Sequence, residues 1–270
     1  MNEGPPLAGK VAIVTGGGRG LGRAMTLGLA QAGAAVVATA AREEAEIARV
    51  AAEAQAAATA GRVLPLLADV TREDDCARAV ATAIERFGRL DVLVNNAGRG
   101  MKYVSEDFMT EPTRFWQTPP DVWRLVIATN VVGPFLMARA AVPPMLAAGR
   151  GRIINVSMNT ETMRRRGFSP YGPSKAALES ATIIWAQDLA DTGVTVNALL
   201  PGGATLTGMI PARFPPHLRA RLLDPAIMVP PLLWLASEQS ADVTGRRFVA
   251  TAWRADDPQA SVAAAAAAGW

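Results

Sequence analysis

The sequence is poor in the residues that build metal sites and hydrolytic triads. Its 270 residues include one cysteine, Cys76, and one histidine, His217. A disulfide within the chain is impossible, and a zinc site would need more Cys and His ligands than this. A Ser-His-Asp hydrolase would have to use His217, which lies in a proline-rich stretch, and the chain has no G-x-S-x-G nucleophile elbow. We therefore expect no metal and no hydrolytic chemistry.

Strong charge of one sign is also absent, because 27 basic residues are balanced by 24 acidic ones. The basic residues are scattered apart from Arg164, Arg165 and Arg166, so no stripe for nucleic acid is present. Residues 1–10 lack the apolar run of a secretion signal. The uncharged stretch 24–41 is interrupted by glycines and reads as helix, turn and buried strand, so no membrane span is expected. These features predict a soluble cytoplasmic protein.

Short apolar runs alternate with helix-period segments along the chain. Continuous apolar strands separated by helices are typical of a parallel sheet covered on both faces. The pattern predicts a single-domain, Rossmann-like, doubly wound α/β sheet of seven strands over residues 1–253, followed by an Ala-rich extension, 254–270. The expected strands are 10–15, 34–39, 63–68, 91–95, 152–156, 195–199 and 247–250, and the expected helices are 20–32, 42–60, 72–87, 121–148 and 171–191.

A glycine-rich turn follows the first expected strand and opens the first expected helix. Glycines let the backbone approach a pyrophosphate, and the helix start presents free N–H groups. A plain structural turn is the alternative, but the position between strand and helix favours phosphate binding. The residues of this candidate cofactor site are Gly16, Gly18, Arg19, Gly20, Leu21 and Gly22.

The end of the second strand bears on the choice of cofactor. NAD enzymes usually place a carboxylate there for the ribose 2′-hydroxyl. Here the segment 38–42 offers no acid and ends in Arg42, which together with Arg19 could pair with a 2′-phosphate. We therefore expect NADP(H), although Arg42 could also be a solvated helix-start residue beside two glutamates.

The chain has two tyrosines and three lysines, and one of each, Tyr171 and Lys175, lie four residues apart. On a helix this spacing places both side chains on one face. A phenol with an ordinary pKa of about 10 can be shifted by a nearby ammonium and can exchange a proton with a carbonyl or alcohol oxygen. We expect the lysine to lower the tyrosine pKa and also to hold a ribose hydroxyl.

These motifs together resemble the short-chain dehydrogenase/reductase family over residues 8–250. The matching residues are Thr15 to Gly22, Asp69-Val70, Asn95-Asn96-Ala97-Gly98, Asn130, Tyr171 with Lys175, and Pro201-Gly202. The resemblance implies that Asp69 and Val70 border the adenine and that Asn96, Ala97 and Gly98 line the ribose side. It also implies a proton relay through Asn130 and Lys175. The segment from Pro201 and Gly202 would cover the nicotinamide, with Thr205 or Thr207 reaching its carboxamide.

The sequence departs from this family at the residue that hydrogen-bonds the substrate oxygen. The family places a serine thirteen residues before the tyrosine, where this chain has Met158, and Ser157 is one residue earlier. Strand side chains alternate faces, so Ser157 could serve only if the strand end bulges. Otherwise Asn159 or a water supplies the donor, or the site lacks one and is slow or takes an imine. We carry Ser157 as a candidate catalytic residue and Met158 and Asn159 as candidate substrate contacts.

Other departures bear on the substrate. The segment 99–120 is longer than in the family and carries aromatic and Met side chains that could form a lid, or alternatively a surface excursion. The Arg164–Arg166 run could recognise an anion, or could be a solvated loop. The segment 208–231 is rich in Pro and apolar residues, as a mobile substrate loop would be. The Ala-rich tail could be a loose helix or a contact with a partner.

The sequence therefore predicts an NADP(H)-dependent short-chain reductase acting on a bulky, mostly apolar carbonyl or secondary alcohol. Tyr171 would be the general acid or base, with Lys175 and Asn130 assisting it. Two alternatives stay open: an imine reductase, and a nucleotide-binding protein with little catalysis. The resemblance further implies a homo-oligomer, a tetramer or dimer, formed through helices that include 171–191.

Overall fold

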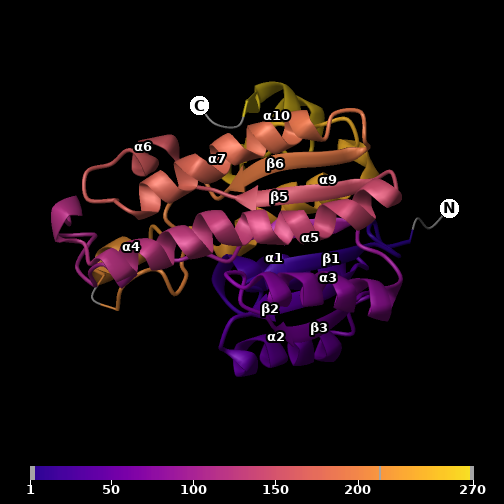
Figure 1. Cartoon of the computed structure of the whole chain (residues 1–270), viewed down its shortest axis with the longest axis horizontal. Helices are drawn as coiled ribbons and strands as arrows, with labels where there is room; N and C mark the ends of the chain where they lie inside the picture. The colour runs from indigo at the N-terminus through magenta and orange to yellow at the C-terminus, as the bar shows by residue number, and fades with distance from the viewer. Residues whose placement is uncertain (1–3, 213, 268–270) are drawn as a thin grey trace.

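The computed structural model describes residues 4–212 and 214–267 and contains one sheet with the order β3-β2-β1-β4-β5-β6-β7-β8 (Figure 1). All neighbouring pairs from β3 to β7 are parallel. This arrangement is the doubly wound sheet that the sequence predicts. The parallel strands are β1 (Val11–Thr15), β2 (Ala35–Ala40), β3 (Arg62–Leu67), β4 (Val92–Asn95), β5 (Gly151–Val156), β6 (Val194–Leu200) and β7 (Arg246–Val249).

Helices cover both faces of the sheet. One face carries α1 (Gly20–Gln31), α2 (Glu44–Ala56) and α9 (Val229–Ala236), and the other carries α3 (Glu73–Phe87), α5 (Gly133–Ala147) and α7 (Tyr171–Asp188). The remaining elements are short or lie in connections: α4 (Pro120–Ile127), α6 (Thr160–Met163), α8 (Pro216–Arg219), α10 (Pro258–Ala264), the π-helical turn η3 (Ala128–Val132), and the 3₁₀ turns η1 (Met101–Tyr103), η2 (Phe115–Gln117), η4 (Pro225–Met228), η5 (Glu238–Ser240) and η6 (Ala250–Ala252).

The core is divided by the sheet into two layers. Every residue of β1 is buried, and alternate residues face opposite layers: Ala12 and Val14 pack toward α1 and α9, whereas Val11 and Ile13 pack toward α3 and α5. This period-two alternation is the geometry of a strand buried on both faces. The continuous apolar runs in the sequence are a direct consequence of it.

The stretch Pro120–Ala147, made of α4, η3 and α5, is long and apolar enough by composition to cross a membrane. In this fold one face of the stretch packs on the sheet, because Met137, Ala141 and Met145 are buried there. The sequence predicts one helix over 121–148, and the structure interrupts that helix with a π-helical turn. Such turns are frequent at functional sites.

The tail extends the sheet by one short strand. After α10, β8 (Ala266–Ala267) pairs with β7 in the antiparallel direction. The seven expected strands are all present, and β8 is an eighth that the Ala-rich composition did not indicate. Val262 and Ala265 pack against the core layer between the sheet and helices α1 and α9. Trp253 contacts the rings of Trp234 and Phe248.

Candidate functional site

The predicted site residues gather where the parallel strands end, which we call the carboxyl edge. The glycine-rich turn follows β1, Asn96 follows β4, Met158 follows β5 and Pro201 follows β6. These four strands are adjacent in the sheet. Ligands of doubly wound sheets bind in the crevice at this edge, near the point where the strand order reverses. The fold therefore brings residues separated by almost two hundred positions to one place.

The glycine-rich turn is shaped by two glycines with positive φ, Gly16 at 64° and Gly20 at 52°. A Cβ on Gly22 would lie 2.0 Å from the Gly16 carbonyl oxygen, so no larger residue fits there. Helix α1 begins without a side-chain cap and without an acidic residue in its first turn. Its first N–H groups are therefore available to an anion, and the helix dipole favours one.

The turn is anchored to the end of β4. The Thr15 hydroxyl accepts hydrogen bonds from the backbone N–H groups of Asn96 at 2.9 Å and Ala97 at 3.0 Å. In return the Asn96 side-chain amide donates to the carbonyls of Thr15 and Gly16. This explains why the Asn-Asn-Ala-Gly motif and the glycine-rich turn occur together in the sequence.

The segment after β6 closes over the turn. A Cβ on Gly20 would lie 3.0 Å from the Thr207 methyl group, and one on Gly208 would lie 3.8 Å from the Arg19 side chain. Arg19 is mostly exposed and is 3.3 Å from Glu46. Arg42, at the end of β2, is exposed as well. Both arginines therefore lie on the side of the turn where the second strand ends.

Tyr171 is the first residue of α7, and Lys175 lies one helical turn later. The Lys175 Nζ donates to the Val156 carbonyl at 2.7 Å and is 6.0 Å from the centre of the Tyr171 ring. Burial raises the pKa of Tyr171 to about 12. Burial also lowers the pKa of Lys175 to about 8, against the opposing charge of Glu179. The expectation that the lysine lowers the tyrosine pKa is thus not what this structure shows, because desolvation of the phenol dominates.

Asn130 lies in the π-helical turn and is completely buried. Its amide donates to the Arg99 carbonyl at 3.0 Å and to the Ser174 hydroxyl at 2.9 Å, and its Oδ1 accepts from the Arg99 N–H. A Cβ on Gly98 would lie 3.4 Å from Asn130 Oδ1 and 3.8 Å from Lys175 Nζ. Asn130, Gly98 and Lys175 therefore border one small space.

Ser157 does not take the place of the missing serine in this structure. Its hydroxyl donates to Glu179 Oε1 at 2.5 Å, within the buried interior. Met158 instead belongs to an apolar cluster that also contacts Tyr171. The bulge that would bring Ser157 beside the tyrosine is absent, because Ser157 continues the register of β5 by bonding to the Leu199 carbonyl. Tyr171 thus packs against an apolar cluster that contains Met158, and the Ser157 hydroxyl is bonded elsewhere.

A buried ion pair behind the site was missed by the sequence reasoning. Arg247 of β7 donates to both carboxylate oxygens of Glu179, at 2.9 and 3.1 Å, and to the Met158 carbonyl at 2.8 Å. The side chains of Glu179 and Arg247 are 2% and 12% exposed. The only sequence signal was an acidic residue four positions after Lys175, at the spacing that shares a helix face.

Apolar side chains form a wall beside Tyr171. The buried members are Met101, Phe108, Met158, Met163 and Phe168, which we call the apolar wall. The rings of Phe108 and Phe168 meet edge to face at 5.9 Å. The 99–120 segment therefore packs partly onto the loop before α7, although Phe115 and Trp116 in the same segment are each 66% exposed. The part of the segment with Met101 and Phe108 packs beside Tyr171, as a lid would, and the part with Phe115 and Trp116 lies on the surface.

The remaining predicted residues have local roles that are visible in the structure. The Asp69 carboxylate accepts hydrogen bonds from the Thr71 N–H and hydroxyl. The Val70 side chain lies against Gly133, where a Cβ would come within 2.7 Å of it. The Asn159 amide donates to the Gly202 carbonyl at 3.0 Å, so one of its two N–H groups is already engaged.

Two further segments complete the description of the carboxyl edge. The Pro201 carbonyl accepts from the Thr251 N–H, and the Thr205 hydroxyl donates to the Gly203 carbonyl. Of the Arg164–Arg166 run, Arg165 stacks over Phe168. Within residues 4–212 and 214–267, no group of three or more His, Cys, Asp or Glu side chains is arranged to hold a metal ion.

Known proteins show the same arrangement. The family model of short chain dehydrogenases matches residues 10–216. The 3-oxoacyl-(acyl-carrier-protein) reductase of Thermotoga maritima is 32% identical, over 89% of this chain and 95% of its own. A 2,5-dichloro-2,5-cyclohexadiene-1,4-diol dehydrogenase of Sphingobium indicum is 34% identical, over 88% of this chain and 93% of its own.

A solved structure extends the likeness to three dimensions. The short-chain type dehydrogenase/reductase of Mycobacterium marinum superposes with a TM-score of 0.77 at 28% identity, covering 88% of this chain and 92% of its own. The sequence match, the strand order and the structural match all lead to the same assignment. The chain belongs to the short-chain dehydrogenase/reductase family of oxidoreductases, whose members use a nicotinamide cofactor.

Proposed function

We propose that this enzyme transfers a hydride between NADP(H) and a bulky, mostly apolar carbonyl or secondary alcohol, with Tyr171 as the proton donor or acceptor. The observation that carries the proposal is the position of the Tyr171 phenol. Its ring centre lies 6.0 Å from Lys175 Nζ, and the ring packs against the apolar wall. A substrate carbonyl bound along that wall would present its oxygen to the phenol.

The protonation states favour reduction at neutral pH. With a pKa of about 12, the phenol is protonated and can donate its proton to the oxygen of a ketone or aldehyde. The charged Lys175 ammonium would stabilise the tyrosinate that remains, and Asn130, bound to Ser174 one residue before the lysine, would hold the relay in place. Oxidation of an alcohol would require the phenolate and would therefore be favoured by higher pH.

The carboxyl edge fits a dinucleotide. The uncapped start of α1 and the glycines at 16, 18, 20 and 22 would hold the pyrophosphate, and Asn96 to Gly98 would line the ribose. When bound, the nicotinamide supplies or accepts the hydride. The absence of an acid at the end of β2 and the exposure of Arg42 support the 2′-phosphate of NADP(H).

Steady-state kinetics with NADPH and NADH tests the cofactor assignment. We expect the Arg42→Ala variant to raise the KM for NADPH by about tenfold, the value of one charge-assisted contact, and to leave the KM for NADH nearly unchanged. A clear preference of the unmodified enzyme for NADH would contradict the NADP(H) assignment without affecting the role of Tyr171.

The substrate class rests on the apolar wall. The two relatives above, by their names, act on an oxoacyl chain and on a chlorinated cyclic diol, so the family position alone does not define a substrate. Here the wall offers Met and Phe side chains and, at Met158, no hydroxyl. These features support a bulky apolar compound whose reacting group is held chiefly by Tyr171.

Imine reduction is the second candidate function, and a specific observation favours it. The Ser157 hydroxyl donates to Glu179 and one of the two N–H groups of the Asn159 amide donates to Gly202, which leaves, of these two side chains, only the second Asn159 N–H to replace the missing donor. An imine that arrives already protonated develops no negative oxygen and needs no second donor. The third reading, a nucleotide-binding protein with little catalysis, predicts inertness toward both substrate classes.

The experiment that tests the proposed function compares two tyrosine variants on a panel of bulky ketones and cyclic imines. Tyr171→Phe should lower kcat by about 10²–10⁴, the usual contribution of a positioned acid. It should keep cofactor affinity within a few-fold. Tyr103→Phe is the matched control, because Tyr103 is the other tyrosine, is 43% exposed, and should leave kcat unchanged. Equal activity of Tyr171→Phe and the unmodified enzyme would refute the role of Tyr171.

We further propose that the protein works in the cytoplasm as a homo-oligomer, a dimer or tetramer. The support is an exposed apolar surface on the helices of one face: Phe135 on α5 is 49% exposed and Ile184 on α7 is 52% exposed. Exposed large apolar side chains of this kind are candidates for association surfaces. We also propose that residues 254–270, of which the structure describes 254–267, form an extension of the single domain 1–253; α10 precedes β8, and β8 pairs with β7.

A further inference from the structure

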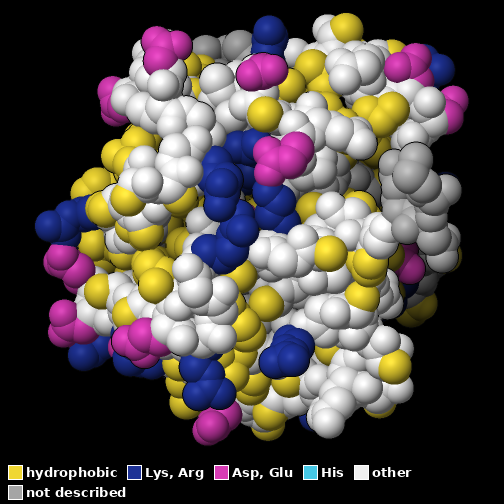
Figure 2. Space-filling model, turned by 90° about the vertical axis from the view of Figure 1, so that its right-hand side faces the viewer, with side chains coloured by type: hydrophobic (Ala, Val, Ile, Leu, Met, Phe, Trp, Pro, Cys, Tyr) yellow, Lys and Arg dark blue, Asp and Glu magenta, His cyan; other side chains and the backbone are white. Residues whose placement is uncertain are grey.

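A group of cations lies at the opposite edge of the sheet, where the parallel strands begin, which we call the amino edge. Figure 2 looks onto the side of the molecule that contains it, and Lys and Arg side chains gather near the centre of that face around an acidic one. Lys10 precedes β1, Arg89 precedes β4, and Arg150 and Arg152 lie at the start of β5. None of these residues belongs to the site at the carboxyl edge.

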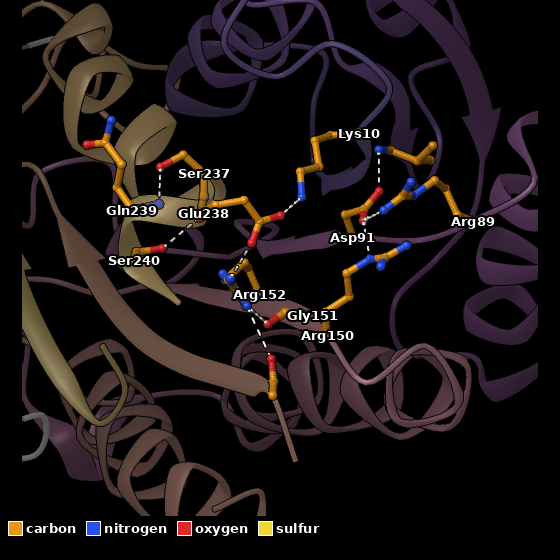
Figure 3. Close-up of polar contacts among 12 residues, drawn as sticks. Lys10, Arg89, Asp91, Arg150, Gly151, Arg152, Ser237, Glu238, Gln239 and Ser240 are labelled. Carbon is orange, nitrogen blue, oxygen red and sulfur yellow. Dashed lines mark hydrogen bonds and ion pairs between the residues drawn. The ribbon is translucent and has the colours of Figure 1, made fainter. Parts of the chain in front are cut away.

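Two carboxylates face these four cations (Figure 3). Asp91 is buried; it accepts from the Val11 N–H at 2.9 Å and lies 2.5 Å from Arg89 and 3.6 Å from Arg150. Glu238 of η5 forms an ion pair with Lys10 and lies 3.4 Å from Arg152 Nη2. The charge of a third carboxylate, Asp242, also acts on Arg152, so four cations face three carboxylates and the local balance stays positive.

Arg152 is the unusual member of the group, because its side chain is only 7% exposed. Its Nη1 donates to the carbonyls of Gly151 at 2.9 Å and Gly193 at 3.2 Å, but its Nε has no hydrogen-bond partner among the residues that the structure describes. A buried polar atom without a partner requires an explanation, and an ion or water is one of the usual ones. Its outer nitrogen donates to Glu238 at 3.4 Å, the long end of the hydrogen-bond range.

Glu238 differs from Asp91 in how it is held. Its side chain is 65% exposed, whereas that of Asp91 is 5% exposed. The pKa of Glu238 is lowered, first by the hydrogen bond from Lys10 and then by the charges of Lys10, Arg152 and Arg150, against a raising effect of burial. Lys10 and Arg152 therefore contact a largely exposed carboxylate from a three-residue surface turn, and the charge of Arg150 also acts on it.

We propose that the amino edge is an anion site that takes a phosphate group in exchange for the Glu238 carboxylate. Lys10, Arg150 and Arg152 would bind the phosphate oxygens, while Asp91 would remain in place to hold Arg89 and Arg150. A phosphate offers more acceptor oxygens than a carboxylate, enough for an ammonium and two guanidinium groups at once. The exchange is non-covalent and does not depend on the proposed reaction at the carboxyl edge.

The test is calorimetric titration of the enzyme with inorganic phosphate and with glycerol phosphate, in chloride buffers of matched ionic strength. A saturating nicotinamide cofactor is present, so that the glycine-rich turn is not available to the titrant. We expect saturable binding of both compounds and a rise in Tm that grows with their concentration. Binding of the ester as well as the free ion would point to a phosphorylated metabolite, and binding of the free ion alone to phosphate itself.

Three variants locate the site. Lys10→Gln and Arg150→Gln should each weaken phosphate binding by about tenfold, the usual value of one charge-assisted contact. Glu238→Gln should instead tighten it by about fivefold to tenfold, because the competing carboxylate charge is removed. Arg165→Gln and Glu111→Gln are controls of matched chemistry outside the amino edge and should change nothing.

Other outcomes would overturn the proposal. If phosphate has no effect beyond that of chloride at equal ionic strength, the cluster is only a structural clamp between η5 and the sheet. If Arg165→Gln weakens binding as much as Arg150→Gln does, the anion binds elsewhere. Weaker or unchanged binding in a folded Glu238→Gln variant would show that Glu238 does not occupy the phosphate position.

Discussion

At the scale of single residues, the direction of one side chain separates this protein from the pattern of its family. Ser157 and Met158 are adjacent at the end of β5, and the pleat sends them to opposite faces. Ser157 therefore meets Glu179 in the interior, and Met158 joins the apolar wall beside Tyr171. A serine one position too early is, in three dimensions, a serine on the wrong face.

Restoring the hydroxyl should accelerate ketone reduction. We expect Met158→Ser to raise kcat for bulky ketones by about 10²-fold, the lower end of the effect of one oxyanion donor. Met163→Ser changes the same residue type within the same apolar wall and should not raise it. Ser157→Ala should leave kcat within about threefold while lowering stability, since its hydroxyl bond to a buried carboxylate is lost. A large loss of kcat in Ser157→Ala, with no gain in Met158→Ser, would return Ser157 to the mechanism.

The buried Lys175 should make the reaction depend on pH. Its pKa of about 8 means that the ammonium is lost as pH rises through that value, while Tyr171, with a pKa of about 12, stays protonated. Ketone reduction should therefore be level below pH 8 and fall above it. Initial rates between pH 6 and 10 at saturating cofactor measure this. A profile that is flat to pH 10 would show that the lysine charge does not assist the phenol.

The loss of the Lys175 charge should lower the reaction rate as pH rises, but it should raise the stability of the folded protein. Its folded-state pKa, about 8, is below the ordinary value of 10.5, so between these values the unfolded chain binds a proton that the folded chain lacks. The free energy of unfolding contributed by Lys175 therefore increases as pH rises from 8 to 10.5. The Tm of the unmodified protein minus that of Lys175→Met should increase across this window. A constant difference would contradict the lowered pKa.

At the scale of elements, the ion pair between Glu179 and Arg247 connects α7 to β7 and to the end of β5. Both partners are nearly buried, so removing Glu179 takes the paired carboxylate away from the buried Arg247 guanidinium. We expect Glu179→Ala to lower the free energy of unfolding by about 3–5 kcal/mol. The double variant Glu179→Ala/Arg247→Met should recover part of this loss. Denaturant unfolding measures both, and a double variant less stable than the single one would show that the charges are not coupled.

Helix α7 has a functional and a structural end. Tyr171 and Lys175 lie in its first two turns and face the site. Ala186 and Leu189, near its end, are buried in the core layer on the α3 and α5 side of the sheet. The sequence period predicted this helix, and it placed the pair on one face. It did not show that the helix start is buried deeply enough to raise one pKa and lower the other, because burial depends on the neighbouring loops.

At the scale of the whole molecule, the exposed apolar side chains of α5 and α7 predict association. If the protein forms the proposed oligomer, the double variant Phe135→Asp/Ile184→Asp should have a lower mass, because it would place charges in an apolar interface. Leu67→Asp is the control, since Leu67 is 38% exposed but lies on β3, at the far edge of the sheet. Light scattering coupled to size exclusion gives the mass. An unmodified protein that is monomeric at micromolar concentration would contradict the proposed oligomer.

The sequence by itself determined the doubly wound fold, the place of the glycine-rich turn and the Tyr171–Lys175 pair. These features are local, since apolar runs, glycine positions and a spacing of four each follow from short-range geometry. Tertiary structure alone decided which way Ser157 faces, how burial sets the two pKa values, and how Arg247 reaches Glu179 from β7. The antiparallel β8 and the cations at the amino edge likewise come from distant parts of the chain. Contacts of that kind depend on how separate elements pack together, so they cannot be predicted from the residues of any short stretch of sequence.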